Sequence, residues 1–301
     1  MTVLAAPKRS GALMTAEWNQ RPVTSAERGE WLPVLDIPAP GRQRRWTVLL
    51  RWLLLLPQFV VVVFLGVAAF FVTIAGWFAA LFTGRLPDGM FRFLSSVLAY
   101  STRVDASAML LVDSYPPFAL SAPTYPVQIE VRPTPLNRAA VFFRLILMIP
   151  AMIVSSLLQS GWYAMCWVLW LITLVLGRLP GPLYAATAAV TRYTMRFNAY
   201  ASLLSPAYPK RLFGDEPAAA DEVRSGTRPL ILDTAAKVLV VLFLLLGLAG
   251  HITNATVESN TGEDTDASGA AAGRHAPDSL PLRSAQEGSF FNLDFSRQDA
   301  R

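Results

Sequence analysis

The sequence predicts an all-α integral membrane protein that consists of two parallel repeats followed by one C-terminal transmembrane helix. Three observations lead to this fold class. Hydrophobic residues form 53% of the 301 residues and charged residues only 16%, whereas about a quarter of a soluble domain is charged. Arginine residues lie directly beside long apolar segments. Finally, a shift by 93 positions aligns residues 44–118 with residues 137–211 at 22 identities in 75 positions.

The identities between the repeats fall on residue types that apolar composition does not explain. They include Arg51 with Arg144, Pro57 with Pro150, Trp77 with Trp170, and residues 84–87 with residues 177–180. The unit is therefore duplicated. We divide the chain into a polar N-terminal tail with a candidate short strand (1–43), membrane repeat 1 (44–118), a linker with a strand (119–136), membrane repeat 2 (137–213), a linker (214–229), a transmembrane helix (230–252) and a disordered acidic tail (253–301).

The apolar segment of each repeat predicts a transmembrane helical hairpin. Between Trp46 and Thr83 the only charge is Arg51, and one helix of this length would measure about 57 Å against about 30 Å of hydrocarbon. Residues 159–161 (Gln-Ser-Gly) interrupt the second apolar segment near its midpoint, and Gln159 aligns with Gly66. We therefore expect two short helices that turn near these positions. The alternative is a single long, tilted helix in each repeat.

The distribution of basic residues predicts which side of the membrane each segment occupies. Lys and Arg number 8 in residues 1–51, 5 in residues 84–138 and 7 in residues 178–229, while the tail after Gly250 carries 4 against 8 acidic residues. Cytoplasmic loops carry the excess of Lys and Arg. We expect five membrane segments in the bacterial cytoplasmic (inner) membrane, with a cytoplasmic N-terminus and an extracytoplasmic C-terminal tail.

Each hairpin is followed by a weaker helical pattern, over roughly residues 89–112 and 183–204. Arg103 lies on a polar stripe of the first, and Arg192 and Arg196 lie one turn apart on the second. This pattern is typical of an interfacial amphipathic helix with a basic face toward water or lipid phosphates. The alternative is a third, less hydrophobic spanning helix.

Two short stretches predict a β element. Residues 127–132 alternate apolar and polar side chains, and Val34 lies 93 positions before Val127. Alternation with a period of two indicates a strand. We expect that the two equivalent strands pair with each other on the cytoplasmic face.

The sequence contains no recognisable catalytic or metal-binding arrangement. The two histidines, His251 and His275, lie at the end of the last apolar segment and in the tail, and no His, Cys and acidic cluster has metal-ligand spacing. No Asp or Glu lies within residues 46–83 or 139–176, which argues against a proton-coupled transporter. The sequence therefore predicts no enzyme activity, no cofactor and no metal, and we expect no nucleic-acid partner.

A repeated set of arginine and tyrosine residues is the candidate binding site. Guanidinium groups suit phosphate in a bidentate geometry, so this set predicts binding of anionic lipid headgroups or of a protein partner in the membrane. The alternative is that these arginines only anchor helix ends at the interface. The set comprises Arg51, Arg85, Arg103, Arg144, Arg178, Arg192, Arg196, Tyr100 and Tyr193.

Three motifs of the first repeat resemble an uncharacterised bacterial membrane family, the domain of unknown function 4389, which often occurs in tandem. They are Arg51 with Pro57 six positions later, Phe82-Thr83-Gly84-Arg85-Leu86-Pro87, and Tyr115-Pro116-Pro117-Phe118. Repeat 2 departs from them, with Leu176 in place of Thr83 and Lys210-Arg211 in place of Pro117-Phe118. The resemblance covers roughly residues 44–213, supports the architecture and implies no known activity.

These observations lead to two functional hypotheses. The first is a non-enzymatic membrane scaffold or accessory subunit of a bacterial cell-envelope complex, which binds through its interfacial helices and acidic tail. The second is a lipid-binding or small transport protein that uses the arginine-lined interface between the two repeats. Both expect membrane lipids with anionic headgroups as partners.

Overall fold

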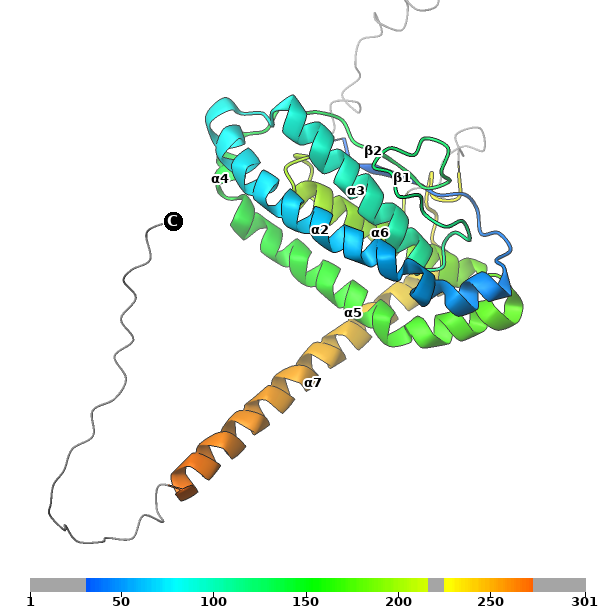
Figure 1. Ribbon diagram of the computed structural model, residues 1–301, viewed down its shortest axis with the longest axis vertical. Helices are drawn as coiled ribbons and strands as arrows, with labels where there is room; N and C mark the ends of the chain where they lie inside the picture. The colour runs from blue at the N-terminus through cyan, green and yellow to red at the C-terminus, as the bar shows by residue number, and fades with distance from the viewer. Residues whose placement is uncertain (1–30, 216–224, 273–301) are drawn as a thin grey trace, which may run out of the picture. The chain divides into compact units, whose positions relative to one another are not determined.

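The computed structural model describes residues 31–215 and 225–272 (Figure 1). Its elements, in chain order, are β1 (Val34–Asp36), α2 (Arg45–Thr83), α3 (Asp88–Ala108), β2 (Gln128–Glu130), α4 (Arg138–Phe142), α5 (Arg144–Leu176), α6 (Gly181–Ala201) and α7 (Thr234–Ala272). The described residues up to Ile252 form one compact unit, and those from Thr253 onward form a second one. The description below concerns the first unit.

The helices of this unit form two layers, and a third layer of strand and loop covers one side. The long helices α2 and α5 make the first layer, and α3 packs on α2 as α6 packs on α5. The shorter helices α3 and α6 also pack on each other and on the ribbon formed by β1 and β2 (Figure 1). The second layer is therefore enclosed, and α6 has fourteen buried residues, many of them alanine and threonine.

The first layer has one face packed against the protein and one apolar face left uncovered. Val48 and Leu55 of α2 are buried, whereas Trp46, Phe64 and Phe82 are 76%, 72% and 73% exposed. Large apolar side chains are exposed along α5 as well. Exposed apolar area of this extent is not stable in water and indicates contact with a lipid phase or another protein.

The long helices end where the sequence changes from apolar residues to glycine and proline. Gly84 and Gly177 adopt the left-handed conformation (φ 73° and 67°) directly after α2 and α5, and each amide donates back to the last turn of its helix. Glycine carries no Cβ and adopts this conformation without strain. Pro87 and Pro180 then immediately precede α3 and α6.

The two repeats exchange equivalent hydrogen bonds through their tryptophans. The indole of Trp77 in repeat 1 donates to the carbonyl of Val141 in repeat 2 at 2.9 Å. The indole of Trp170 in repeat 2 donates to the carbonyl of Val48 in repeat 1 at 2.8 Å. Because Trp77 aligns with Trp170 and Val48 with Val141, each repeat contacts the other through the same pair of positions.

The backbone shows the same reciprocity at the helix ends and in the β ribbon. Leu136 donates its amide to the carbonyl of Gly84, and Gln43, which lies 93 positions before Leu136, donates to that of Gly177. In the ribbon, Leu35 pairs with Ile129 and Asp36 with Gln128, antiparallel, and a shift by 93 positions exchanges these two pairs. The repeats are therefore related by a pseudo-two-fold axis that passes through the ribbon. The predicted pairing of the two strands is confirmed.

The prediction of a hairpin in each repeat is wrong. Gly66 lies inside α2 and Gln159–Gly161 inside α5, and both helices run unbroken. A glycine in the interior of a helix costs only about 1 kcal/mol relative to alanine, whereas a turn at this position would leave backbone groups without partners in an apolar environment. The alternative of one long helix in each repeat is the one that the structure adopts.

The described residues contain three helices that are long and apolar enough to cross a bilayer, and the chain is therefore a membrane protein. They are Arg45–Thr83, Arg144–Leu176 and, within α7, Thr234–Thr256. This number replaces the five segments expected from sequence. The helices α3 and α6 are not among them, and they pack between the long helices and the ribbon.

The last helix crosses α5 at two glycines. A Cβ atom on Gly161 would lie 1.7 Å from the carbonyl oxygen of Phe243, and one on Gly247 would lie 2.0 Å from that of Leu157. Only glycine permits backbones to approach this closely. α7 continues to Ala272, so residues 253–272 are helical rather than disordered as predicted. The rest of the predicted acidic tail lies outside the described residues.

Candidate functional site

The arginine near the start of the first long helix is buried and fully partnered. Nη1 of Arg51 donates to the carbonyls of Ser107 and Val112, both at 2.7 Å, and Nη2 lies 3.2 Å from a carboxylate oxygen of Asp113. Thr47 also donates its hydroxyl to that carboxylate. The positive charge of Arg51 is therefore neutralised inside the protein.

The equivalent arginine of the second repeat makes the same carbonyl contacts without the carboxylate. Nε of Arg144 donates to the carbonyl of Tyr200 at 2.8 Å and Nη2 to that of Ser205. These carbonyls belong to the residues aligned with Ser107 and Val112. The side chain of Arg144 also lies over the ring of Tyr200, 4.0 Å from its centroid.

The two arginine sites differ in whether a carboxylate accompanies the guanidinium. Asp113 aligns with Pro206, and no carboxylate of the described residues forms an ion pair with Arg144. Arg144 is only 4% exposed. A buried charge without a counterion costs several kcal/mol. An anion bound beside Arg144 would therefore stabilise this site.

The arginines of the enclosed helices hold the loops that cover them. Arg103 donates to the carbonyls of Ala119 and Leu120, and Arg196 to those of Pro33 and Lys210. Burial, and next the like charge of Arg192, lower the pKa of Arg196 to about 10, which still leaves it charged at neutral pH. These side chains are buried and do not form the basic outer face that the sequence predicted.

The remaining predicted site residues do not gather in one place. Arg192 pairs with Asp215 at 2.6 Å, and the hydroxyl of Tyr100 donates to the amide oxygen of Gln58. Tyr193 is buried, and burial raises the pKa of its hydroxyl to about 12. Arg85 and Arg178 stay exposed beyond the ends of the two long helices. Of the predicted set, Arg144 lines a cavity of about 600 Å³ and Arg103 a smaller pocket of about 290 Å³.

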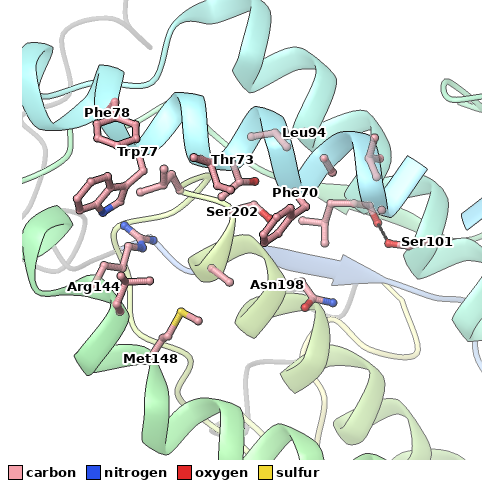
Figure 2. Close-up of a pocket in the computed structure, with 18 of the residues that line it drawn as sticks. Phe70, Thr73, Trp77, Phe78, Leu94, Ser101, Arg144, Met148, Asn198 and Ser202 are labelled. Carbon is pink, nitrogen blue, oxygen red and sulfur yellow. Dashed lines mark hydrogen bonds between the residues drawn. The ribbon is translucent and has the colours of Figure 1, made fainter. Parts of the chain in front are cut away.

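This cavity has a volume of about 600 Å³ and lies between the two repeats, lined by α2, α3, α5 and α6. Figure 2 shows Arg144 on its α5 wall, near Trp77 of α2, and Ser101 and Asn198 on the walls of α3 and α6. Most of the lining is apolar. Phe70, which belongs to the lining, is also 62% exposed on the uncovered face of the first layer, so the cavity meets that face.

The cavity is larger on the side of repeat 1, where two of its residues are small. Gly66 and Ala69 line it, and repeat 2 has Gln159 and Trp162 at the aligned positions. Trp162 is fully buried and donates to the hydroxyl of Thr187 at 3.2 Å, and Thr187 aligns with Leu94 in the cavity wall. Repeat 2 therefore fills part of this space with an indole and keeps a smaller pocket of about 270 Å³, which Gln159 lines.

Sequence reasoning did not single out Asp105, a carboxylate at the interface between the repeats. It lies on α3 in a narrow space formed with Thr102, Thr191, Thr194 and Asn198. Asn198 is its aligned counterpart. Burial raises the pKa of Asp105 to about 7, since a low-dielectric environment disfavours the ionised form. The alignment of Asp105 with Asn198 was the sequence signal that could have identified this position.

We expect Asp105→Asn to stabilise the protein at high pH. The pKa of Asp105 in the folded state lies above the value of 3.8 that it departs from, so ionisation weakens folding as pH rises from about 4 to about 7. The variant should match the parent near pH 4 and exceed it at pH 8 by up to about 4 kcal/mol. Thermal unfolding in detergent measures this difference. The exposed Asp88 supplies the control, Asp88→Asn, and a stability gain that is equal at all pH values would contradict the assignment.

Comparison with known proteins gives one match, found twice. The family described as a domain of unknown function (DUF4389) matches residues 45–119 and 138–212. Each match begins at or just before one long helix and ends after the enclosed helix that follows it. No curated protein and no solved structure matches the chain.

Proposed function

Because the chain belongs to the DUF4389 family, whose unit it carries twice in tandem, we propose that its function resides in the interface between the two units. There it binds one anionic amphiphile, a molecule with an acyl chain and a single carboxylate or phosphate head. The protein acts on this ligand by holding it and not by chemical conversion.

The apolar part of the cavity suits the acyl chain. Sites for small molecules usually measure about 300–1,000 Å³ and combine apolar walls with a few polar groups, and this cavity of about 600 Å³ fits that description. Its connection to the exposed apolar face gives a ligand from the surrounding lipid an apolar route of entry.

The observation that carries the proposal is the uncompensated charge of Arg144. Its counterpart Arg51 has Asp113, whereas Arg144 has no carboxylate among the described residues and borders the cavity. An anionic head placed beside it would supply the missing charge. Ser101 and Asn198 offer a hydroxyl and an amide in the same cavity for the remaining hydrogen bonds.

The proposed location is the bacterial cytoplasmic membrane, with the N-terminal residues in the cytoplasm and the tail outside. The excess of Lys and Arg in residues 1–51 and the acidic character of the tail support this orientation. Arg85 and Arg178, which are exposed next to the apolar layer, are suited to contact anionic headgroups at the membrane surface.

Filling the cavity tests the proposal. Ala69→Trp gives repeat 1 the residue that repeat 2 has at the aligned position, and we expect it to reduce the amphiphile that co-purifies in mild detergent at least tenfold. Ala68→Trp adds the same side chain at an exposed neighbouring position and should leave the bound amount unchanged. Mass spectrometry of extracted lipid provides the measurement. Equal ligand in both variants would reject the cavity as the site, and a stoichiometric protein partner in place of lipid would favour the scaffold hypothesis.

A further inference from the structure

The pseudo-two-fold axis and the charges on it determine how the long helices can lie in a membrane. We propose that α2 and α5 lie within one leaflet, roughly parallel to the membrane plane, with their uncovered apolar face toward the acyl chains. The β ribbon then faces the cytoplasm, and α7 is the one described helix that crosses the bilayer.

The symmetry makes the alternative, in which α2 and α5 both cross the bilayer, energetically unfavourable. The axis relates α2 to α5 and passes through the β ribbon, as the reciprocal contacts show. If the two helices crossed the bilayer in opposite directions, this axis would lie in the membrane plane at mid-depth. The ribbon would then lie at mid-depth as well, beside the hydrocarbon.

The ribbon carries charged side chains that cannot be placed at that depth. Arg228 lies 2.8 Å from a carboxylate oxygen of Glu130, and Glu130 also pairs with Arg132 at 2.7 Å. The side chain of Arg132 is 61% exposed. Exposed charges at the centre of a bilayer are among the most costly groups in membrane proteins, whereas the same groups are stable in water.

The loop between the repeats leads to the same arrangement. After α3 this loop passes the first half of α2, where Tyr115 donates its hydroxyl to the carbonyl of Leu54. It then reaches the end of α2, where the amide of Leu136 donates to the carbonyl of Gly84. Much of it is exposed and irregular. Irregular backbone exposed to lipid does not occur within hydrocarbon, so a crossing α2 would place this loop where it is not tolerated.

Helix length distinguishes α2 and α5 from the candidate span in α7. At about 1.5 Å per residue, α2 with 39 residues measures about 58 Å and α5 with 33 residues about 50 Å. Both exceed the hydrocarbon thickness of about 30 Å by far. The candidate span in α7 has 23 residues, or about 35 Å, which suits a crossing.

The charges around the long helices fit one leaflet. Arg44 and Arg45 at the start of α2 and Arg85 after its end are all exposed, as expected of a helix whose two ends lie at the same headgroup level. With α2 in the plane, the 5 Lys and Arg of residues 84–138 stay on the side of the 8 in residues 1–51. A crossing α2 would place them on the opposite side.

Labelling of single cysteines in the full chain tests this arrangement. In a Cys166→Ser background, Gly41→Cys and Gly89→Cys place thiols before and after α2 at positions where no atom lies within 4 Å of an added Cβ. Ser289→Cys marks the C-terminal tail. In membrane vesicles of known sidedness, we expect an impermeant maleimide to label the first two from the same side and the third from the other. Labelling of Gly41→Cys and Gly89→Cys from opposite sides would overturn the proposal.

Depth measurement gives an independent test. Spin labels on Leu53→Cys, Phe64→Cys and Phe71→Cys, all on the exposed face of α2, should report equal depth for a helix in the plane. Depth that changes steadily along the helix would refute the arrangement. Neither measurement depends on a ligand, so failure here leaves the cavity proposal standing, and failure of the cavity variants leaves this arrangement standing.

Discussion

Pro206→Asp is expected to weaken binding of the anionic amphiphile strongly while leaving the fold intact. The substitution gives repeat 2 the carboxylate that Asp113 supplies in repeat 1, where it neutralises Arg51 at 3.2 Å. Position 206 directly follows Ser205, whose carbonyl already accepts from Arg144, so the new carboxylate should reach that guanidinium. A ligand would then meet a paired charge. Because pairing a buried charge is worth several kcal/mol, we expect affinity to fall on the order of 100-fold.

The control for this prediction is Pro206→Asn, which introduces a side chain of the same shape as Asp without its charge. This variant should bind the amphiphile as the parent does. Titration of the purified protein with a fluorescent long-chain fatty acid and with an anionic phospholipid separates a carboxylate head from a phosphate head. A neutral methyl ester of the fatty acid should bind weakly to all three proteins. If Pro206→Asp binds either anion as tightly as Pro206→Asn, the role assigned to Arg144 is wrong.

Gly161→Leu is expected to detach α7 from α5. The carbonyl oxygen of Phe243 lies 1.7 Å from the position of a Cβ at residue 161, and this atom belongs to the backbone, so no side-chain rotation can relieve the clash. Separation of the two helices would expose Phe243, which is fully buried. Losses of more than about 4 kcal/mol are exceptional for single substitutions, and we expect one here.

A cross-link measures this detachment directly. The Oγ of Ser156 and the Nε2 of His251 lie 3.2 Å apart across α5 and α7, so a short bifunctional maleimide should join Ser156→Cys to His251→Cys in a Cys166→Ser background. Adding Gly161→Leu should prevent it. Ala68→Leu changes the aligned position on α2, which is exposed, and should have no effect. Equal cross-linking with all three would mean that the glycine contact does not hold α7.

Much of the fold was predictable because the two repeats can be aligned in the sequence. The glycines that end α2 and α5 and the strands 93 positions apart could all be located. The continuity of α2 through Gly66 could not, since residue types alone do not show whether the surroundings can satisfy a turn. The burial of Arg103 and Arg196 could not be predicted from the sequence either. The carbonyls that accept their hydrogen bonds belong to loops that approach these arginines only in the folded chain.

The candidate site was visible in the alignment of the repeats, but in the differences and not in the identities. Arg51 and Arg144 were identified as a pair, yet the exchange of Asp113 for Pro206 is what makes Arg144 the unusual member. In the same way, Ala69 in place of Trp162 marks the half of the interface with the larger cavity. Side-chain volume at an aligned position becomes meaningful only when the packing partner is known.

The reciprocal bonds between the repeats have an evolutionary consequence. A protein with a single unit would leave the indole of its Trp77 equivalent and the carbonyl of its Gly84 equivalent without partners, so it should exist as a homodimer of two identical chains. The two repeats of this chain take the places of those two subunits. In a homodimer every substitution occurs twice, whereas in one chain the repeats can differ, so that Trp162 fills part of the space in repeat 2 while Ala69 leaves it open in repeat 1.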